Sequence, residues 1–572
     1  MKKLIYSLSV IIVALSLFSC STNLKPLNSG HFNCHPNPLE VKAGKVDATI
    51  DGIFPTKYFD KKSIITITPV LVSKINPTLT YPGTPTKFQG EKVIGNNKVI
   101  KYKEGGNYTV KASFDYVPDM AQSELRLVIS VTKSNKKKYT LPEVKVADGV
   151  FTTAELAERA LSGSFGPVII PDKFQQIIQE TQEADIKFLI QQADLRSSET
   201  NSLALVALTQ KIKEAQGIST QEISGLEISG YASPDGAFDL NKNLAEKREK
   251  VTTDYINREL NKIRSSVTID TKFTAEDWEG FQALMEKSNI QDKQVIIRVL
   301  SMYSDPEQRE REIKNLSAAY KSIADDILPK LRRSRLKLTV DITGKTDEAI
   351  VAWADVDPNK LSLEELLYAA TLVKTVSEKE ALYKKVTERY PREFRGFNNL
   401  GVIQYSQGQH TDAFTSFAKA LSLNPKSPDA NYNAGLVALA QNKLSQAEEM
   451  FGNSAGTTGN LDNALGTVYA VKGDYYRANA ALEGVASNNA ALIQILQKDY
   501  KSARTTLENI VNPNGYTAYL GAILAARTND RNAVYSNVSK AVSIDSSLKD
   551  KIAKDIEFSK YFSDANFTSL LK

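Results

Sequence analysis

The chain has 572 residues, and its 72 basic and 66 acidic side chains leave a net charge of only +6. This length fits three or four domains, and a hydrophobic share of 42% is ordinary for globular protein. A charge this small and dispersed gives no reason to expect a nucleic-acid partner, and two cysteines exclude a fold built on disulfides. With only three histidines and no catalytic motif, the sequence predicts no enzyme, cofactor or metal site.

The N-terminus has the form of an export signal. Two lysines precede an apolar run from 4 to 17, which is too short to span a bilayer comfortably. The following Leu-Phe-Ser-Cys ends at Cys20 and resembles the lipobox of bacterial lipoproteins. The resemblance implies a signal peptide over 1–19 and acylation of Cys20, and several acyl chains give stable membrane attachment. The alternative is a secretory peptide whose cysteine is incidental. Residues 20–31 are expected to form a flexible tether.

Residues 32–145 carry short segments in which apolar and polar side chains alternate. The alternation is clearest at 46–53, 64–72, 108–114 and 125–131. Strands with one buried face, separated by Gly, Asn and Ser turns, predict an all-β sandwich. His31, Cys34 and His35 lie close together at its start, but their spacing is not that of a structural zinc site.

The region from 150 to 345 combines apolar strand patterns with long helical patterns and predicts an α+β domain. After a strand at 226–230, five residues follow a fixed spacing: Gly230, Gly236, Asn241, Leu244 and Arg248. This spacing, placed between a strand and a helix, resembles the motif of the OmpA-like, peptidoglycan-associated family. A segment at 327–340 with paired arginines resembles the closing strand of that family.

The resemblance implies a site for the diaminopimelate group of peptidoglycan, which the family binds with an Asp and an Arg. Arg248 stands at the arginine position, but Ser233 replaces the Asp, so one of the two charges that a zwitterion needs is missing. Asp235 supplies the missing negative charge only if the loop turns its side chain inward. Asn241 is the fourth candidate residue for binding peptidoglycan. Turn chemistry for Asp235 and a structural role for Arg248 are the alternatives. An insertion at about 274–316 contains a Trp and resembles that of Bacteroidota members of the OmpA-like family. Membership of that group does not by itself imply peptidoglycan binding.

Residues 360–555 are helical in pattern, with small residues at regular intervals. Six residues fit the 34-residue register of tetratricopeptide repeats: Phe397, Leu400, Gly401, Ala413, Phe417 and Pro425. Such all-α solenoids bind protein or peptide in a concave groove. The candidate groove residues are Asn398, Gln404, Asn431, Asn433 and Asn463. Asn side chains suit hydrogen bonding to the backbone of an extended peptide, and simple solvation is the alternative for each of them.

Together these parts predict a non-catalytic outer-membrane lipoprotein that faces the periplasm. It would link the membrane, and through Arg248 the peptidoglycan, to an unidentified protein partner held by the repeats. The alternative is a protein-docking subunit of an envelope secretion, assembly or appendage complex without peptidoglycan binding. Exposure on the cell surface is disfavoured because no acidic tract follows Cys20, whereas Bacteroidota surface lipoproteins carry one.

Overall fold

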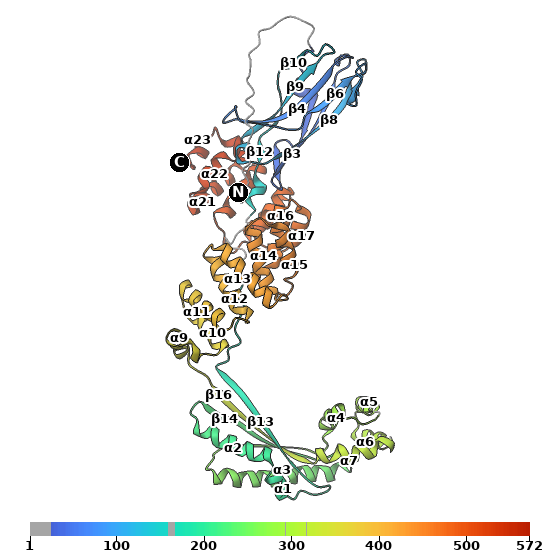
Figure 1. Cartoon of the computed structure of the whole chain (residues 1–572), viewed down its shortest axis with the longest axis vertical. Helices are drawn as coiled ribbons and strands as arrows, with labels where there is room; N and C mark the ends of the chain where they lie inside the picture. Colours follow the sequence, from blue (N-terminus) through green and yellow to red (C-terminus); the bar gives the residue numbers. More distant parts are fainter. Residues whose placement is uncertain (1–23, 158–165, 292, 316) are drawn as a thin grey trace. The chain divides into compact units, whose positions relative to one another are not determined.

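The computed structural model describes residues 24–157, 166–291, 293–315 and 317–572 (Figure 1). The chain forms two compact units. Unit 1 combines the residues up to Pro171 with Val376–Lys572, and unit 2 is Asp172–Thr375. Cys20 and the expected signal peptide lie outside the described residues.

The N-terminal part of unit 1 is built from two β-sheets. The first holds β1 (Phe32–His35), β2 (Leu39–Lys42), β3 (Lys45–Phe54), β8 (Gly106–Asp115) and β12 (Val150–Phe151). The second holds β4 (Ile64–Ser73), β5 (Thr80–Pro82), β6 (Thr86–Gly90), β7 (Lys98–Ile100), β9 (Ser123–Thr132), β10 (Lys138–Thr140) and β11 (Val144–Asp148). The four long strands coincide with the four alternating segments of the sequence, because side chains on a strand point to opposite faces in turn. The region extends past the expected end at 145, since β12 pairs with β2.

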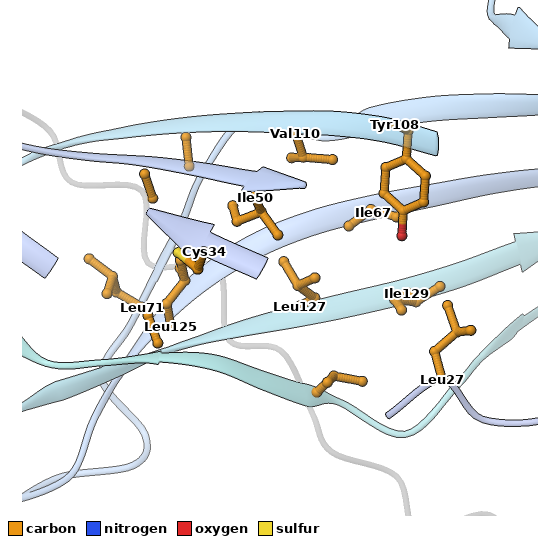
Figure 2. Packing of buried hydrophobic residues seen from close by; sticks show 14 of the residues in the cluster. Leu27, Cys34, Ile50, Ile67, Leu71, Tyr108, Val110, Leu125, Leu127 and Ile129 are labelled. Atoms are coloured by element: carbon orange, nitrogen blue, oxygen red, sulfur yellow. The ribbon is translucent and has the colours of Figure 1, made fainter. Parts of the chain in front are cut away.

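Both sheets contribute to one hydrophobic core, part of which is shown in Figure 2. Ile50 comes from the first sheet and Ile129 from the second, and both are fully buried. Leu27 is also buried in this core, and the Tyr58 hydroxyl donates to the Lys25 carbonyl. The prediction of a flexible tether up to residue 31 is therefore wrong for residues 24–31, because an apolar side chain fixes this segment on the sheets.

Cys34 occupies the same core, and burial raises the pKa of its thiol to about 11. A thiol that resists ionisation is a poor metal ligand. The described residues contain no group of three or more His, Cys, Asp or Glu side chains placed to hold a metal ion.

Unit 2 contains a four-stranded sheet in the order β13 (Ile177–Lys187), β16 (Arg333–Thr343), β14 (Gln221–Tyr231) and β15 (Ile269–Thr274). The pairs of β16 with β13 and β14 are antiparallel, whereas β14 and β15 are parallel. The helices α1 (Ser197–Thr200), α2 (Leu203–Gly217) and α3 (Phe238–Lys262) connect these strands. Apolar side chains from α2 and α3 share one core with β13, β14 and β16.

Five helices lie between β15 and β16 among the residues that the structure describes. They are α4 (Trp278–Lys287), α5 (Lys293–Met302), α6 (Pro306–Asn315), α7 (Ser317–Asp326) and α8 (Leu328–Leu331). Phe281, Met285 and Ile296 anchor a separate hydrophobic cluster within them. The inserted structure thus reaches further than the expected end near 316. Unit 2 ends with α9 (Asp347–Val356) and α10 (Leu363–Leu372), so the expected repeat array from 360 onward is divided between the two units.

The C-terminal part of unit 1 consists of paired helices: α11 (Val376–Arg389), α12 (Phe394–Ser406), α13 (His410–Leu423), α14 (Pro428–Ala440), α15 (Leu444–Gly452), α16 (Leu461–Val471), α17 (Tyr475–Ala481), α18 (Asn488–Leu496), α19 (Tyr500–Glu508), α20 (Gly515–Arg527), α21 (Arg531–Ile544), α22 (Leu548–Lys554) and α23 (Ala565–Ser569). Neighbouring helices approach closely where the sequence has small residues. The first helices of successive pairs also contact one another, from α12 through α14, α16 and α18 to α20, and together form one face. We call this face the groove. Among the described residues, no helix combines the length and apolar character needed to cross a bilayer.

Candidate functional site

An extended segment of the chain itself lies in the groove. We call residues 166–171 the strap. The Val168 N–H donates to Asn433 Oδ1 (2.8 Å), and Asn433 Nδ2 donates back to the Val168 carbonyl (2.8 Å). In the same way, the Ile170 N–H donates to Asn399 Oδ1 (2.9 Å), and Asn399 Nδ2 donates back to the Ile170 carbonyl (2.9 Å). The two asparagines therefore bind alternate residues of the strap as a neighbouring β-strand would.

Asn398 completes this network from between the other two asparagines. Its Nδ2 donates to the Val168 carbonyl (3.2 Å) and to Asn399 Oδ1 (3.0 Å), and its own Oδ1 accepts from Asn433 Nδ2 (2.9 Å). The side chains of Asn398 and Asn433 are fully buried. Buried amides need all their partners, so the strap's backbone satisfies groups that would otherwise be costly to bury.

The remaining predicted groove residues serve the array itself. Gln404 Oε1 accepts from Ser416 Oγ (2.7 Å) between α12 and α13. Asn431 Nδ2 donates to the carbonyls of Pro425 and Ser427, just before and at the start of α14. Asn463 Oδ1 accepts from Ser487 Oγ (3.2 Å), which links α16 to the cap of α18. Among the described residues, the hydrogen bonds of these three side chains run within the array and not to the strap, and a peptide-binding role for them stays a prediction.

Asn399 was missed by sequence reasoning, although its position carries a usable signal. It stands two residues before Gly401, as Asn433 stands two residues before Gly435. A Cβ on Gly435 would lie 2.5 Å from the Phe451 ring, so these glycines mark where the second helix of each pair crosses the first. Counting back two residues from each glycine would have identified Asn399 and Asn433, each of which makes two hydrogen bonds to one residue of the strap.

The second candidate site is the loop between β14 and α3. Arg248 lies on α3 but is only 1% exposed. Its guanidinium donates to the carbonyls of Gln192 (3.0 Å), Tyr231 (2.9 Å) and Leu189 (3.3 Å). Burial, together with the charge of Arg332, lowers the pKa of Arg248 to about 10. In this arrangement Arg248 holds backbone together and does not present its charge to a ligand.

The loop residues Ser233 and Asp235 both accept hydrogen bonds from Arg332, which precedes β16. Arg332 Nε donates to Ser233 Oγ (3.2 Å) and its NH2 group pairs with Asp235 Oδ2 (3.2 Å). Asp235 is thus turned inward, as its proposed role required. Asn241 Nδ2 donates to the Gly236 carbonyl (3.3 Å) and fixes the loop.

The inserted helices cover the same loop. The Gly236 N–H donates to Glu310 Oε1 on α6 (2.8 Å), and the Asp277 N–H at the start of α4 donates to the Ala232 carbonyl (3.1 Å). Sequence reasoning singled out neither Arg332 nor Glu310 for the site. The Gly236 N–H of the loop therefore already has an acceptor within the protein, the carboxylate of Glu310.

The comparisons with known proteins bear on the helical part of the chain. The family model described as TPR repeat matches residues 401–442. A tetratricopeptide repeat protein from Parabacteroides merdae is 14% identical, over 39% of this chain and 89% of that chain, with a TM-score of 0.30. PilW, a type IV pilus biogenesis factor, is 14% identical over 40% of this chain and all of its own (100%), with a TM-score of 0.28.

YrrB, described as a TPR protein with an unusual peptide-binding site, is 15% identical over 33% of this chain and 88% of its own, with a TM-score of 0.20. Similarities this low carry no argument about function. The search of curated proteins finds no match. What the comparisons establish is that α12 to α14, where the strap is bound, include tetratricopeptide repeats.

Proposed function

We propose that this protein is a non-catalytic scaffold of the bacterial envelope, in which tetratricopeptide repeats hold a protein partner. The observation that carries the proposal is the set of buried asparagines in the groove, which already binds the backbone of an extended segment. A surface that binds backbone through paired amide hydrogen bonds suits a peptide partner better than a small molecule.

A photo-crosslinking amino acid placed at Ile169 tests this role in cells. Ile169 belongs to the strap but is 37% exposed, so a probe there lies at the groove without replacing a hydrogen-bonding residue. We expect a discrete protein adduct at this position. The fully exposed Ile94, in the strand-rich part of the chain, is the control. The same adducts from both positions would contradict partner binding at the groove.

We further propose that acylation at Cys20 anchors the protein in the outer membrane, facing the periplasm. The lipobox-like sequence supports this. Cell fractionation of the wild type and Cys20→Ser should place the wild type with outer membranes and the variant in the soluble periplasm. Recovery of both in the same fraction would remove the lipid anchor from the proposal. Degradation of the wild type by protease added to intact cells would reverse the orientation.

For unit 2 we propose an OmpA-like domain that docks protein and does not bind peptidoglycan. Its support is Arg248, whose guanidinium is buried and engaged by three carbonyls, and Glu310, which already accepts from the loop amide of Gly236. A ligand carboxylate would have to displace these backbone carbonyls from the Arg248 guanidinium.

Peptidoglycan binding is a second candidate, favoured by the Arg332–Asp235 ion pair in the same loop. A zwitterionic ligand could separate this ion pair and form two new ones, its carboxylate with Arg332 and its ammonium with Asp235. These are the two opposite charges that the family uses. Sedimentation with purified sacculi separates the two proposals. Docking without wall binding predicts that the wild type stays in the supernatant. Co-sedimentation that Asp235→Asn abolishes would establish the second candidate instead.

A further inference from the structure

The strap is recognised through its backbone and very little through its side chains. The asparagines of α12 and α14 contact the peptide groups of Val168 and Ile170, while the Ile169 side chain is 37% exposed. Of the strap side chains, Val168 packs against the core of the neighbouring helices. The groove therefore selects an extended backbone with an apolar residue at one position, and many peptide sequences meet that requirement.

The strap is also held in place by its neighbours in the chain. Thr153 and Leu156 belong to the 3-10 helix Thr153–Leu156, and both are buried; Leu156 lies in the core of the C-terminal helices. A tethered segment faces its site at an effective concentration on the order of millimolar. A free peptide with the same contacts competes poorly at micromolar concentration, so an exchangeable groove would look closed in an ordinary binding experiment.

We propose that the strap is an exchangeable occupant of the groove, and that the physiological ligand is an extended peptide segment of a partner that takes over the hydrogen bonds to Asn399 and Asn433. This inference rests on the proposed scaffold function and names the class of partner for that site. Partner binding then releases residues 166–171 from the repeats, so that occupancy of the groove decides whether this segment is bound or free.

Proline substitution tests the proposal because it removes one N–H donor and leaves an extended backbone intact. Val168→Pro removes the donor to Asn433 Oδ1. Ile169→Pro is the matched control, since the Ile169 N–H makes no hydrogen bond within the described part of the chain. The probe is a fluorescent synthetic peptide with the sequence of residues 166–172, titrated against each full-length protein and followed by anisotropy.

We expect Val168→Pro to bind the peptide at least tenfold more tightly than the wild type, and Ile169→Pro to bind like the wild type. Adding Asn433→Ala to Val168→Pro should abolish binding. Equal affinity of the two proline variants, or failure of a Val168→Pro protein with wild-type circular dichroism to bind, would overturn the proposal. Crosslinking from Ile169 in cells would survive that failure if the partner binds over the strap without displacing it, so the two tests are distinguishable.

Hydrogen exchange on the unmodified chain gives a second measurement that does not depend on any variant. Amides of Val168 and Ile170 should be protected in the free protein, because both donate to buried acceptors. Millimolar peptide should remove that protection while the Asn433 helix stays folded. Protection that persists with peptide bound would contradict exchange.

Discussion

Arg248 and Arg258 lie on the same helix, α3, in opposite surroundings. Arg248 donates to three backbone carbonyls from a buried position, whereas Arg258 is exposed. We expect Arg248→Ala to lower the free energy of unfolding of unit 2 by more than about 3 kcal/mol, since it leaves several buried acceptors without donors. Arg258→Ala should cost less than about 0.5 kcal/mol.

Tryptophan fluorescence during urea unfolding measures this difference selectively. The two tryptophans of the chain, Trp278 and Trp353, both belong to unit 2. A small effect of Arg248→Ala would mean that the guanidinium is not structural and would reopen its role in ligand binding.

Asp555 is a second buried charge with a measurable consequence. Burial, together with the nearby Glu557 charge, raises the pKa of Asp555 to about 6, and the Tyr519 hydroxyl donates to its carboxylate (2.6 Å). The folded protein holds this proton up to about pH 6, whereas the unfolded chain releases it near pH 4. Stability from this group is therefore fully present below about pH 4 and is lost as the pH rises to 6.

Between about pH 4 and pH 6.5 this group should lower the free energy of unfolding of unit 1 by up to about 3 kcal/mol. Asp555→Asn, which cannot ionise, should remove that part of the pH dependence. Denaturant titrations followed by circular dichroism at both pH values test this, with the exposed Asp550→Asn as the control. An unchanged pH dependence in Asp555→Asn would contradict the raised pKa.

At the scale of elements, the close approach of paired helices depends on glycine. A Cβ on Gly435 would lie 2.5 Å from the Phe451 ring, whereas a Cβ on Gly452 would meet no atom within 4 Å. We expect Gly435→Ala to destabilise unit 1 by about 1–3 kcal/mol through overpacking. Gly452→Ala, in the partner helix α15, should be neutral or stabilising by up to about 1 kcal/mol. Equal effects in circular dichroism melts would mean that the ring at Phe451 moves aside.

Elements with a short sequence period could be predicted, and contacts between distant segments could not. Alternation along β3 and β9 reflects burial of one strand face, and the spacing of Gly401 and Gly435 reflects one repeat. The strap shows no such period. Val168 and Ile170 pair with asparagines 229 to 265 positions away, so their sequence reveals only an apolar segment.

The same reasoning explains what was missed in the loop of unit 2. The motif spacing identified Arg248 and Asp235 as neighbours of one site. Arg332 and Glu310 reach that site only through the closing strand and the inserted helices, which no local pattern relates to the loop. Burial of Arg248 also depends on carbonyls from a separate segment, at Leu189 and Gln192.

At the scale of the whole molecule, a buried ion pair in the C-terminal helices of unit 1 is linked through Thr153 to the N-terminal part of that unit. Arg527 pairs with Glu557 (2.5 Å) and also donates to the Ile495 carbonyl (3.1 Å), while Thr153 donates to the same Glu557. The Glu557 side chain is only 2% exposed. Arg527→Ala should therefore destabilise unit 1 by about 3–5 kcal/mol, because it leaves a buried carboxylate without its counter-charge.

The matched control is Arg531→Ala, since Arg531 forms an exposed ion pair with Asp564 and should contribute less than about 1 kcal/mol. Limited proteolysis adds a local readout: cleavage after Thr153 should increase in Arg527→Ala and not in Arg531→Ala. Similar proteolysis of both variants would show that the buried pair does not fix this segment.

The strap's position in the sequence sets the order in which it meets its site. Val168 is synthesised 265 residues ahead of Asn433, so the strap is present before the helices that bind it exist. When those helices fold, the first peptide within reach is the strap of the same molecule. In newly made protein the strap thus covers the asparagine amides of the groove while unrelated unfolded chains are nearby. A ligand then reaches the groove only by competing with a segment that is covalently attached to it.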